Sequence, residues 1–123
     1  KWKTTSRTRG SLGGTIMELI KGTLDAMVLK TLSWGPLHGY AVTRWIRRQT
    51  DGALRVEDAA LYQALHRMER RGWVKAEWGL SENNRKAKYY RLTARGRKQL
   101  TEQSRSIRRY ATALLKVLAA ETA

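Results

Sequence analysis

The sequence predicts a mainly helical fold with one small β-hairpin, and two observations support this prediction. Between residues 23 and 72, apolar residues recur every three or four positions, which is the period of an amphipathic helix. Between residues 73 and 92 the period falls to two, which is the period of a strand. At 123 residues the chain can form one domain with a modest core.

The first predicted helix begins at residue 23 and is apolar on almost every side. Leu24, Val28 and Leu32 recur at helical spacing, and other apolar residues fill the remaining faces before Gly35 and Pro36 end the helix. A helix of this kind is buried on more than one side. In so small a chain, we expect the second covering surface to come from another subunit.

Two more helices are predicted, one over residues 39–49 and one after Asp58. Asp58 is a residue type that caps helix N-termini. Leu61, Leu65 and Met68 place apolar side chains on one face of the third helix, at positions i, i+4 and i+7. We therefore expect that face of the third helix to be buried.

A β-hairpin follows the third helix. Apolar and aromatic residues alternate from Trp73 to Trp78 and again from Tyr89 to Leu92, and we expect the polar stretch 79–87 to form the loop between the two strands. Three helices followed by a hairpin are the layout of a winged helix-turn-helix domain, in which the hairpin is the wing. We expect this domain over residues 17–93.

A long last helix is predicted after Thr93, and it occupies residues 94–123. Its seam residues step by four and three positions in a heptad-like pattern, and they are Leu100, Ser104, Ile107, Ala111, Leu114 and Leu118. Because nothing remains in the chain to cover this seam, we expect a C-terminal dimerisation helix; the alternative is a helix folded back on its own domain. The predicted dimer contacts are Leu24, Val28, Leu100, Ile107, Ala111, Leu114 and Leu118.

Residues 1–16 differ from the rest of the chain. They are rich in Lys, Arg, Ser, Thr and Gly, show no period, and are followed at once by Met17. We expect a disordered basic leader or a tail derived from expression. The alternative is a basic arm that touches DNA, as homeodomain arms do.

The charge of the chain favours a polyanionic partner. Lys and Arg number 25 against 10 Asp and Glu, which gives a formal net charge of +15. Nucleic acid is the first candidate and an anionic membrane the second. Residues 80–99 carry seven basic side chains against the single acid Glu82, whereas residues 17–34 sum to zero. This division is what a DNA-facing side and a subunit-facing side require.

The composition argues against an enzyme. The chain has no Cys, its only imidazoles are His38 and His66, and neither lies at metal-ligand spacing from a further ligand. The sequence contains no catalytic triad and no phosphate-loop motif, so we expect no catalysis, no metal and no cofactor. No apolar run approaches the roughly 18 residues of a membrane span, and we expect a cytoplasmic protein without a membrane partner.

Sequence readout is expected from the outward face of the third helix, because a helix fits the major groove of DNA. Gln63 can bond an adenine through both amide atoms, and Tyr62 can reach a phosphate or a thymine methyl group; the alternative for Tyr62 is a half-buried packing role. His38 is expected to cap the second helix or to contact a phosphate. The DNA-binding set predicted from the residues is Ala59, Tyr62, Gln63, His66, Arg67, Arg85, Lys86, Lys88, His38 and Tyr40.

The tryptophans allow a further hypothesis. Trp34, Trp45, Trp73 and Trp78 all lie in predicted elements, so we expect them to pack in the core. The functional alternative is a small aromatic effector that binds between subunits, in a pocket lined by Trp34 or Trp45.

Four stretches of the sequence together resemble the PadR family of transcriptional regulators. They are Gly22–Asp25, Leu37–Tyr40, Leu61–Gly72 and Lys88–Thr93, within a resemblance that spans residues 19–118. Each stretch is weak alone, and their combination is specific. The resemblance implies a winged helix-turn-helix with a C-terminal dimerisation helix. It also implies a repressor, often of detoxification, efflux or stress genes, that a small molecule or another signal releases.

The resemblance also implies residue roles. In the family the third helix reads the major groove, and the wing touches the DNA backbone or the minor groove. These roles fall on Tyr62, Gln63, His66, Arg67, Asn84, Arg85 and Lys86. Two departures matter. The family commonly has Pro where this chain has Gln63, which affects local geometry or base preference, and the short last helix matches a short-tailed subgroup in which an inducer pocket is less assured.

The sequence therefore predicts a homodimer that binds double-stranded DNA at a palindromic operator and regulates transcription, as a repressor by the family resemblance. The alternative is a nonspecific nucleic-acid-binding protein, such as a nucleoid-associated structural protein. The net charge alone fits both functions equally well.

Overall fold

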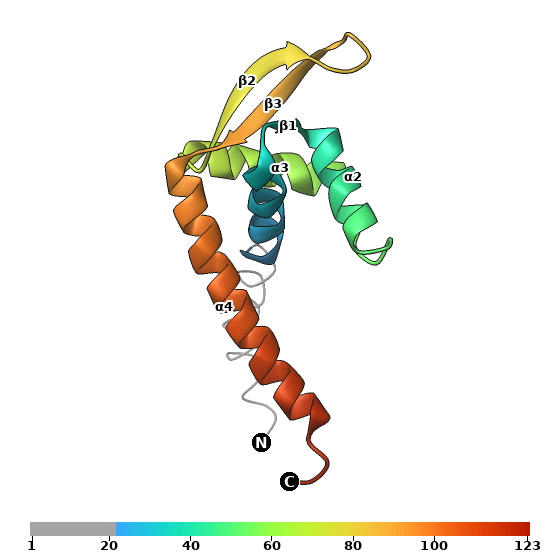
Figure 1. The fold of residues 1–123 in the computed structure, drawn as a ribbon, viewed down its shortest axis with the longest axis vertical. Coiled ribbons are helices and arrows are strands. Elements are labelled where there is room, and N and C mark those ends of the chain that lie inside the picture. Colours follow the sequence, from blue (N-terminus) through green and yellow to red (C-terminus); the bar gives the residue numbers. More distant parts are fainter. Residues whose placement is uncertain (1–21) are drawn as a thin grey trace, which may run out of the picture.

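The computed structural model describes residues 22–123, whose arrangement is shown in Figure 1. The chain is helical over residues 22–31 (the N-terminal helix) and continues through η2 (Leu32–Trp34), β1 (Leu37–His38) and α2 (Gly39–Gln49). The later elements are α3 (Asp58–Arg70), β2 (Val74–Leu80), β3 (Lys86–Leu92) and α4 (Ala94–Ala119). The mainly helical fold with a hairpin is confirmed. The predicted leader, residues 1–16, lies outside the described residues.

The core lies where the N-terminal helix, α2 and α3 meet the sheet. The buried stripe predicted on the third helix is confirmed, because Leu61, Leu65 and Met68 are fully buried. Burial of one such side chain stabilises the fold by roughly 1.5–3 kcal/mol, so the stripe fixes which face of α3 turns inward. The other members of the buried cluster are Val28, Leu29, Leu32, Val42, Ile46, Ala64, Val74, Tyr90 and Leu92.

One predicted dimer contact on the N-terminal helix is wrong. Val28 is completely buried inside its own subunit, so its side chain cannot reach a partner, and Leu24 is half-buried and also packs against the core. Part of the surface beside this helix is supplied by α4 of the same chain. A cleft between the N-terminal helix and α4 is lined by Met27 and Ile107 among others, so these two helices are neighbours within one subunit.

The strands of the described chain form one antiparallel sheet in the order β1-β3-β2. The hairpin pairs Val74 with Leu92 at its base and Leu80 with Lys86 near its tip. Both strands extend further than predicted, and the loop shrinks to residues 81–85, because main-chain pairing continues through the polar residues of an exposed wing. β1 has no signal in the sequence, since two residues are too few to show a period.

The two N-terminal caps of α3 and α4 differ in kind. Glu57, not Asp58, is the N-cap residue of α3, and it forms no side-chain cap bond. Asp58 is instead the first helical residue, where its charge still complements the helix dipole. The predicted cap of α4 is confirmed, because the Thr93 hydroxyl group accepts a hydrogen bond from the amide of Gly96 at 3.0 Å.

α4 begins against the domain and then leaves it (Figure 1). Gly96 is buried, and a β-carbon there would collide with the carbonyl oxygen of Trp73, so the helix starts in tight contact with the segment that joins α3 to β2. Beyond residue 111, every residue of α4 is exposed. Within residues 22–123, no helix combines the length and the apolar character that crossing a membrane requires.

The core packing predicted for the tryptophans holds for two of them and is wrong for two. Trp45 and Trp73 are half-buried and pack against the core. Trp34 and Trp78 are 66% and 64% exposed. Trp34 ends η2 at the surface, and Trp78 lies on the half of β2 that is nearer to the tip of the hairpin.

Candidate nucleic-acid interface

The outward face of α3 presents most of the residues predicted to read DNA. Because Leu61 and Leu65 turn inward, Ala59, Gln63 and His66 are exposed on the opposite side. Tyr62 is 46% exposed, so its side chain is partly open to solvent and partly packed against the protein. Its phenol rests on α2, where its oxygen would lie 2.7 Å from a β-carbon built at Gly39.

The start of α2 supports this face. His38 is the N-cap residue of α2, and its Nδ1 atom accepts a hydrogen bond from the amide of Ala41 at 3.2 Å, so the capping role predicted for His38 is confirmed. Its ring lies between two tyrosines, with centroid distances of 6.5 Å to Tyr40 and 5.5 Å to Tyr89. The pairing of His38 with Tyr89 across β1 and β3 joins the start of α2 directly to the wing.

The tip of the wing is a tight turn with basic residues on it. The amide of Asn84 donates to the carbonyl oxygen of Ser81 at 2.8 Å, and Asn84 has a φ of +60°, a conformation that asparagine tolerates better than most residues. Arg85 and Lys86 follow and are exposed. The Lys86 ammonium group lies 5.5 Å from the ring centre of Trp78, which holds the charge close to the strand.

A side-chain hydrogen bond next to this turn holds the two strands of the wing together. The Tyr89 hydroxyl group donates to the carbonyl oxygen of Leu80 at 3.0 Å. A β-carbon at Gly79 would lie 3.3 Å from the Tyr89 ring, so glycine leaves room for that ring across the hairpin. The wing therefore presents its basic tip on a braced two-stranded support.

One open groove of about 850 Å³ joins these three regions. Tyr40 and Arg44 reach it from α2, Tyr62 and His66 from α3, and Trp78 and Lys86 from the wing. Arg44 and Trp78 were not in the predicted set. The guanidinium group of Arg44 lies 5.2 Å from the ring centre of Tyr40, and its i+4 spacing from Tyr40 on one helix was the signal in the sequence.

Lys88 is less available than predicted. It is half-buried, its ammonium group lies 3.9 Å from a carboxylate oxygen of Glu69, and the same group lies 5.7 Å from the ring centre of Tyr90. Burial, followed by the negative charge of Glu69, raises the pKa of Tyr90 above its usual range. The Tyr90 phenol therefore stays neutral in the lining of the groove, and the Lys88 ammonium group lies close enough to Glu69 to offset its charge.

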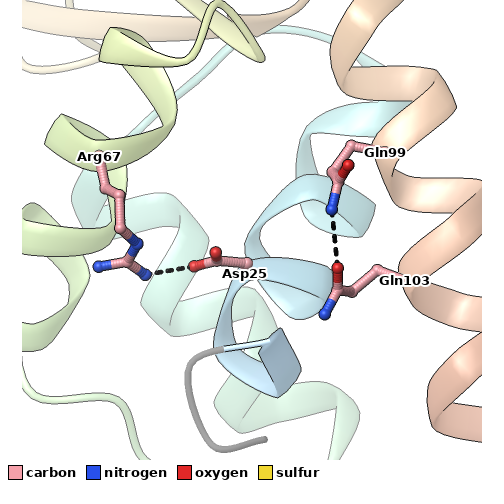
Figure 2. Close-up of polar contacts among 4 residues, drawn as sticks. All are labelled: Asp25, Arg67, Gln99 and Gln103. Carbon is pink, nitrogen blue, oxygen red and sulfur yellow. Dashed lines mark hydrogen bonds and ion pairs between the residues drawn. The ribbon is translucent and has the colours of Figure 1, made fainter. Parts of the chain in front are cut away.

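Arg67 is not on the outward face. Its guanidinium group lies 2.5 Å from a carboxylate oxygen of Asp25, and the two side chains are 17% and 9% exposed (Figure 2). Residue 67 falls on the flank of α3, between exposed His66 and buried Met68, where a buried carboxylate on the N-terminal helix is within reach. The expectation that Arg67 contacts DNA is therefore not retained. Among residues 22–123, no group of three or more His, Cys, Asp or Glu could hold a metal ion.

Comparison with known proteins agrees with this geometry. The model of the transcriptional regulator PadR-like family matches residues 28–102. The chain is similar in structure to a transcriptional regulator from Clostridium thermocellum, at 28% identity over 80% of this chain and 93% of that one, with a TM-score of 0.72. It is also similar to a PadR-like transcriptional regulator from Bacillus cereus, at 25% identity over 85% of this chain and 99% of that one, with a TM-score of 0.71.

A third similar structure covers more of the chain. A PadR family transcriptional regulator from Eggerthella lenta matches at 27% identity over 94% of this chain and 99% of that one, with a TM-score of 0.67. The family and these neighbours are transcriptional regulators rather than enzymes, and regulation of transcription implies contact with DNA. The match to the family model covers more than half of the sequence, and this chain belongs to the PadR-like family of transcriptional regulators.

Proposed function

We propose that this chain binds double-stranded DNA in a sequence-specific manner, acts as a homodimer and represses transcription. The observation that supports the proposal most is the shared groove. Tyr62 and His66 of α3, Lys86 of the wing and the start of α2 line the same groove. Gln63 lies outside this lining but is exposed on the same face of α3. DNA laid against this surface meets base-reading and phosphate-binding side chains together.

Base reading is assigned to α3. Gln63 is exposed and carries an amide that can donate to and accept from one adenine edge. Ala59, near the start of the helix, is small and exposed, so the N-terminal end of α3 can approach the floor of the major groove. Tyr62 lies beside Gln63, and its contact with Gly39 holds the phenol in one place.

Phosphate binding is assigned to the wing and the groove wall. Arg85 and Lys86 are exposed at the wing tip, and Arg44 is exposed on α2. Contacts of this kind release counterions from DNA, so they give affinity and salt dependence without reading sequence. Because these residues are distinct from Gln63, substitutions can change affinity for DNA without changing base preference, and the reverse.

The homodimer is supported by the outer part of α4. Leu114 and Leu118 are 42% and 71% exposed, and they form the outer end of the predicted heptad-like seam. At the inner end of the seam, Leu100 packs against the core of its own subunit, so it is not retained as a dimer contact. An apolar seam that remains exposed in one copy is covered when a second copy supplies the same seam. Two reading helices related by a two-fold axis require a palindromic operator.

Selection from a random duplex pool, followed by footprinting, tests the DNA-binding proposal. We expect one palindromic sequence with half-sites about 10 bp apart, or a multiple of that distance, bound by a species of twice the chain mass in light scattering. Equal affinity for every duplex would instead favour a nonspecific nucleic-acid-binding protein. A monomer on the selected operator would overturn the homodimer.

The repressor assignment rests on the family resemblance and on steric exclusion of polymerase from the promoter. A dimer bound over a promoter would exclude polymerase from it. A reporter gene placed behind the selected operator should be silenced by the protein and restored by Gln63→Ala. Increased reporter expression with the wild-type protein would identify an activator.

A small aromatic effector is a second proposal, supported by one observation. The rings of Trp34 and Trp45 lie 5.5 Å apart, and both line a cleft of about 290 Å³ beside Pro36. The Lys30 ammonium group lies 4.9 Å from the centre of the Trp34 ring, which would favour an anionic ring system. Tryptophan fluorescence should be quenched by a planar aromatic carboxylate such as a hydroxycinnamate, and Trp34→Leu should remove the response. A panel that leaves fluorescence unchanged would end this proposal.

A further inference from the structure

We propose that the Asp25–Arg67 ion pair is a positioning device that fixes the orientation of α3 relative to α4, and so the spacing of half-sites that the protein accepts. The inference rests on the proposed homodimeric function, which it deepens. It concerns two residues that do not touch DNA themselves. It starts from the contacts on the two sides of the N-terminal helix.

The first contact joins the N-terminal helix to α3. Asp25 and Arg67 are separated by 42 positions in the chain, and their side chains are 9% and 17% exposed. Apolar packing of the Leu61 and Leu65 stripe attracts α3 to the core without a preferred direction. An ion pair with a planar guanidinium group has a required direction. The pair therefore adds to α3 a rotational constraint that the stripe lacks.

This rotational constraint acts on α3 close to the residues that are proposed to read DNA. Arg67 directly follows His66 and lies one helical turn beyond Gln63, both of which are exposed on the reading face. Because α3 is one rigid helix, a rotation about its axis that breaks the Arg67 contact also turns Gln63. The angle at which the reading face meets DNA is therefore set in part by Asp25.

The second contact joins the N-terminal helix to α4. The Gln103 side chain fills the space that a β-carbon at Gly22 would need. Gln103 is held in this position by Gln99, whose amide donates to it at 2.8 Å. Figure 2 shows the N-terminal helix between the two contacts, with Arg67 on one side and the two glutamines on the other.

The two contacts together form a continuous link from the reading helix to the dimerisation helix. In a homodimer the α4 helices set the positions of the two subunits, and the N-terminal helix transfers that position to α3. Loss of the ion pair should therefore change how sharply the protein distinguishes half-site spacings. A residue that served stability alone would change the melting temperature and leave this discrimination intact.

The test compares spacings on the operator selected by the wild-type protein. The two half-sites are moved apart or together by one and two base pairs, and affinity is measured by fluorescence anisotropy. For the wild type we expect a loss of at least about tenfold for a two-base-pair change, because each base pair rotates one half-site by about a tenth of a helical turn. For Asp25→Leu combined with Arg67→Met, we expect the same change to cost less than about threefold.

This double substitution is chosen because apolar residues that replace a buried ion pair usually preserve stability. The matched control applies the same changes to the exposed pair on the wing, as Glu77→Leu with Arg91→Met, where the charged atoms lie 3.7 Å apart and both side chains are at least half exposed. The control should lower the affinity for DNA by the same factor at every spacing, so its preference among half-site spacings should equal that of the wild type.

The outcomes separate the two proposals. A wild-type protein with no preferred spacing overturns the homodimeric proposal, and the positioning role with it. A sharp wild-type preference that the buried double variant retains overturns the positioning role alone. If the double variant does not fold, Arg67→Lys takes its place, because the ammonium group keeps the charge and removes the planar, directional contact of the guanidinium group. Unchanged discrimination in Arg67→Lys then overturns the proposal.

Discussion

The phenol of Tyr62 on α3 lies over Gly39, the first residue of α2. A β-carbon at residue 39 would come within 2.7 Å of the Tyr62 oxygen and 2.9 Å of the ring carbon that bears it. Gly39 does not have a positive φ, so its backbone conformation is open to any residue. Glycine is therefore required at this position by the packing of the Tyr62 ring and not by the backbone conformation.

The first prediction follows from this contact. Gly39→Ala should push the Tyr62 ring aside and weaken binding to the selected operator by about tenfold, the effect of one disturbed base or phosphate contact. The free energy of unfolding should change by less than about 1 kcal/mol, since only the end of a flexible side chain has to move. Anisotropy titration and thermal unfolding measure the two quantities. In a Tyr62→Ala background, Gly39→Ala should have no further effect on affinity.

The sequence predicted the parts of the fold that local patterns encode. The bounds of α2 and the buried stripe of α3 agree with the structure because helical period and capping residues act within one segment. The Thr93 cap was found for the same reason. The exposed reading residues then follow from the stripe, since a buried face of a helix determines the opposite one.

The predictions that were wrong concern residues whose surroundings depend on contacts between segments far apart in the sequence. Val28 belongs to an all-round apolar helix, and the sequence does not reveal that the core of the same chain buries it completely. Arg67 has the outward spacing of a DNA contact, and only the tertiary structure brings Asp25 to it. Trp78 alternates like a core residue, yet it is exposed on the half of β2 that is nearer to the tip of the hairpin.

The second prediction concerns sequence readout by Gln63. Gln63→Ala should lower the preference for one base pair in each half-site by 1–3 kcal/mol, because the lost bidentate contact discriminates by about that amount. Binding to unrelated duplexes should change little, and the melting temperature should stay within a few degrees, since the residue is exposed. Selection repeated with the variant measures the change. Gln49→Ala, an exposed glutamine at the end of α2, is the control that should keep the wild-type preference.

The third prediction concerns the charge of the wing tip. Arg85→Ala with Lys86→Ala should weaken operator and unrelated duplexes by similar factors. It should also reduce the slope of log affinity against log salt by about four, because each of the two wings in the proposed dimer loses two phosphate contacts. Arg105→Ala with Arg109→Ala removes the same charge from exposed positions on α4 and should leave the slope unchanged. A variant that altered base preference instead of the slope would contradict the division between wing and α3.

The fourth prediction concerns the cap of α2. His38→Ala removes the side chain that accepts from the amide of Ala41, so the free energy of unfolding should fall by about 1 kcal/mol. His38→Asn supplies another accepting side chain and should recover most of that loss. Urea denaturation monitored by circular dichroism measures both. Equal stability of the alanine and asparagine variants would show that the ring contacts with Tyr40 and Tyr89, rather than the cap, carry the contribution of His38.

The fifth prediction concerns the exposed seam of α4. Leu114→Asp with Leu118→Asp places charges where the second subunit is proposed to pack, so light scattering should give the mass of one chain. The melting of the domain core should persist, because both side chains are exposed in the single chain.

The loss of one subunit should cost far more affinity than any single contact. Two half-sites held by one dimer bind with an effective concentration that a monomer lacks, and this term commonly reaches 10²–10⁴. We therefore expect operator affinity to fall by at least about a hundredfold, to the level of an isolated half-site. Thr112→Asp, one residue past the seam position Ala111 and exposed, adds the same kind of charge off the seam and should remain dimeric. A double variant that stays dimeric would place the subunit contact elsewhere on the chain.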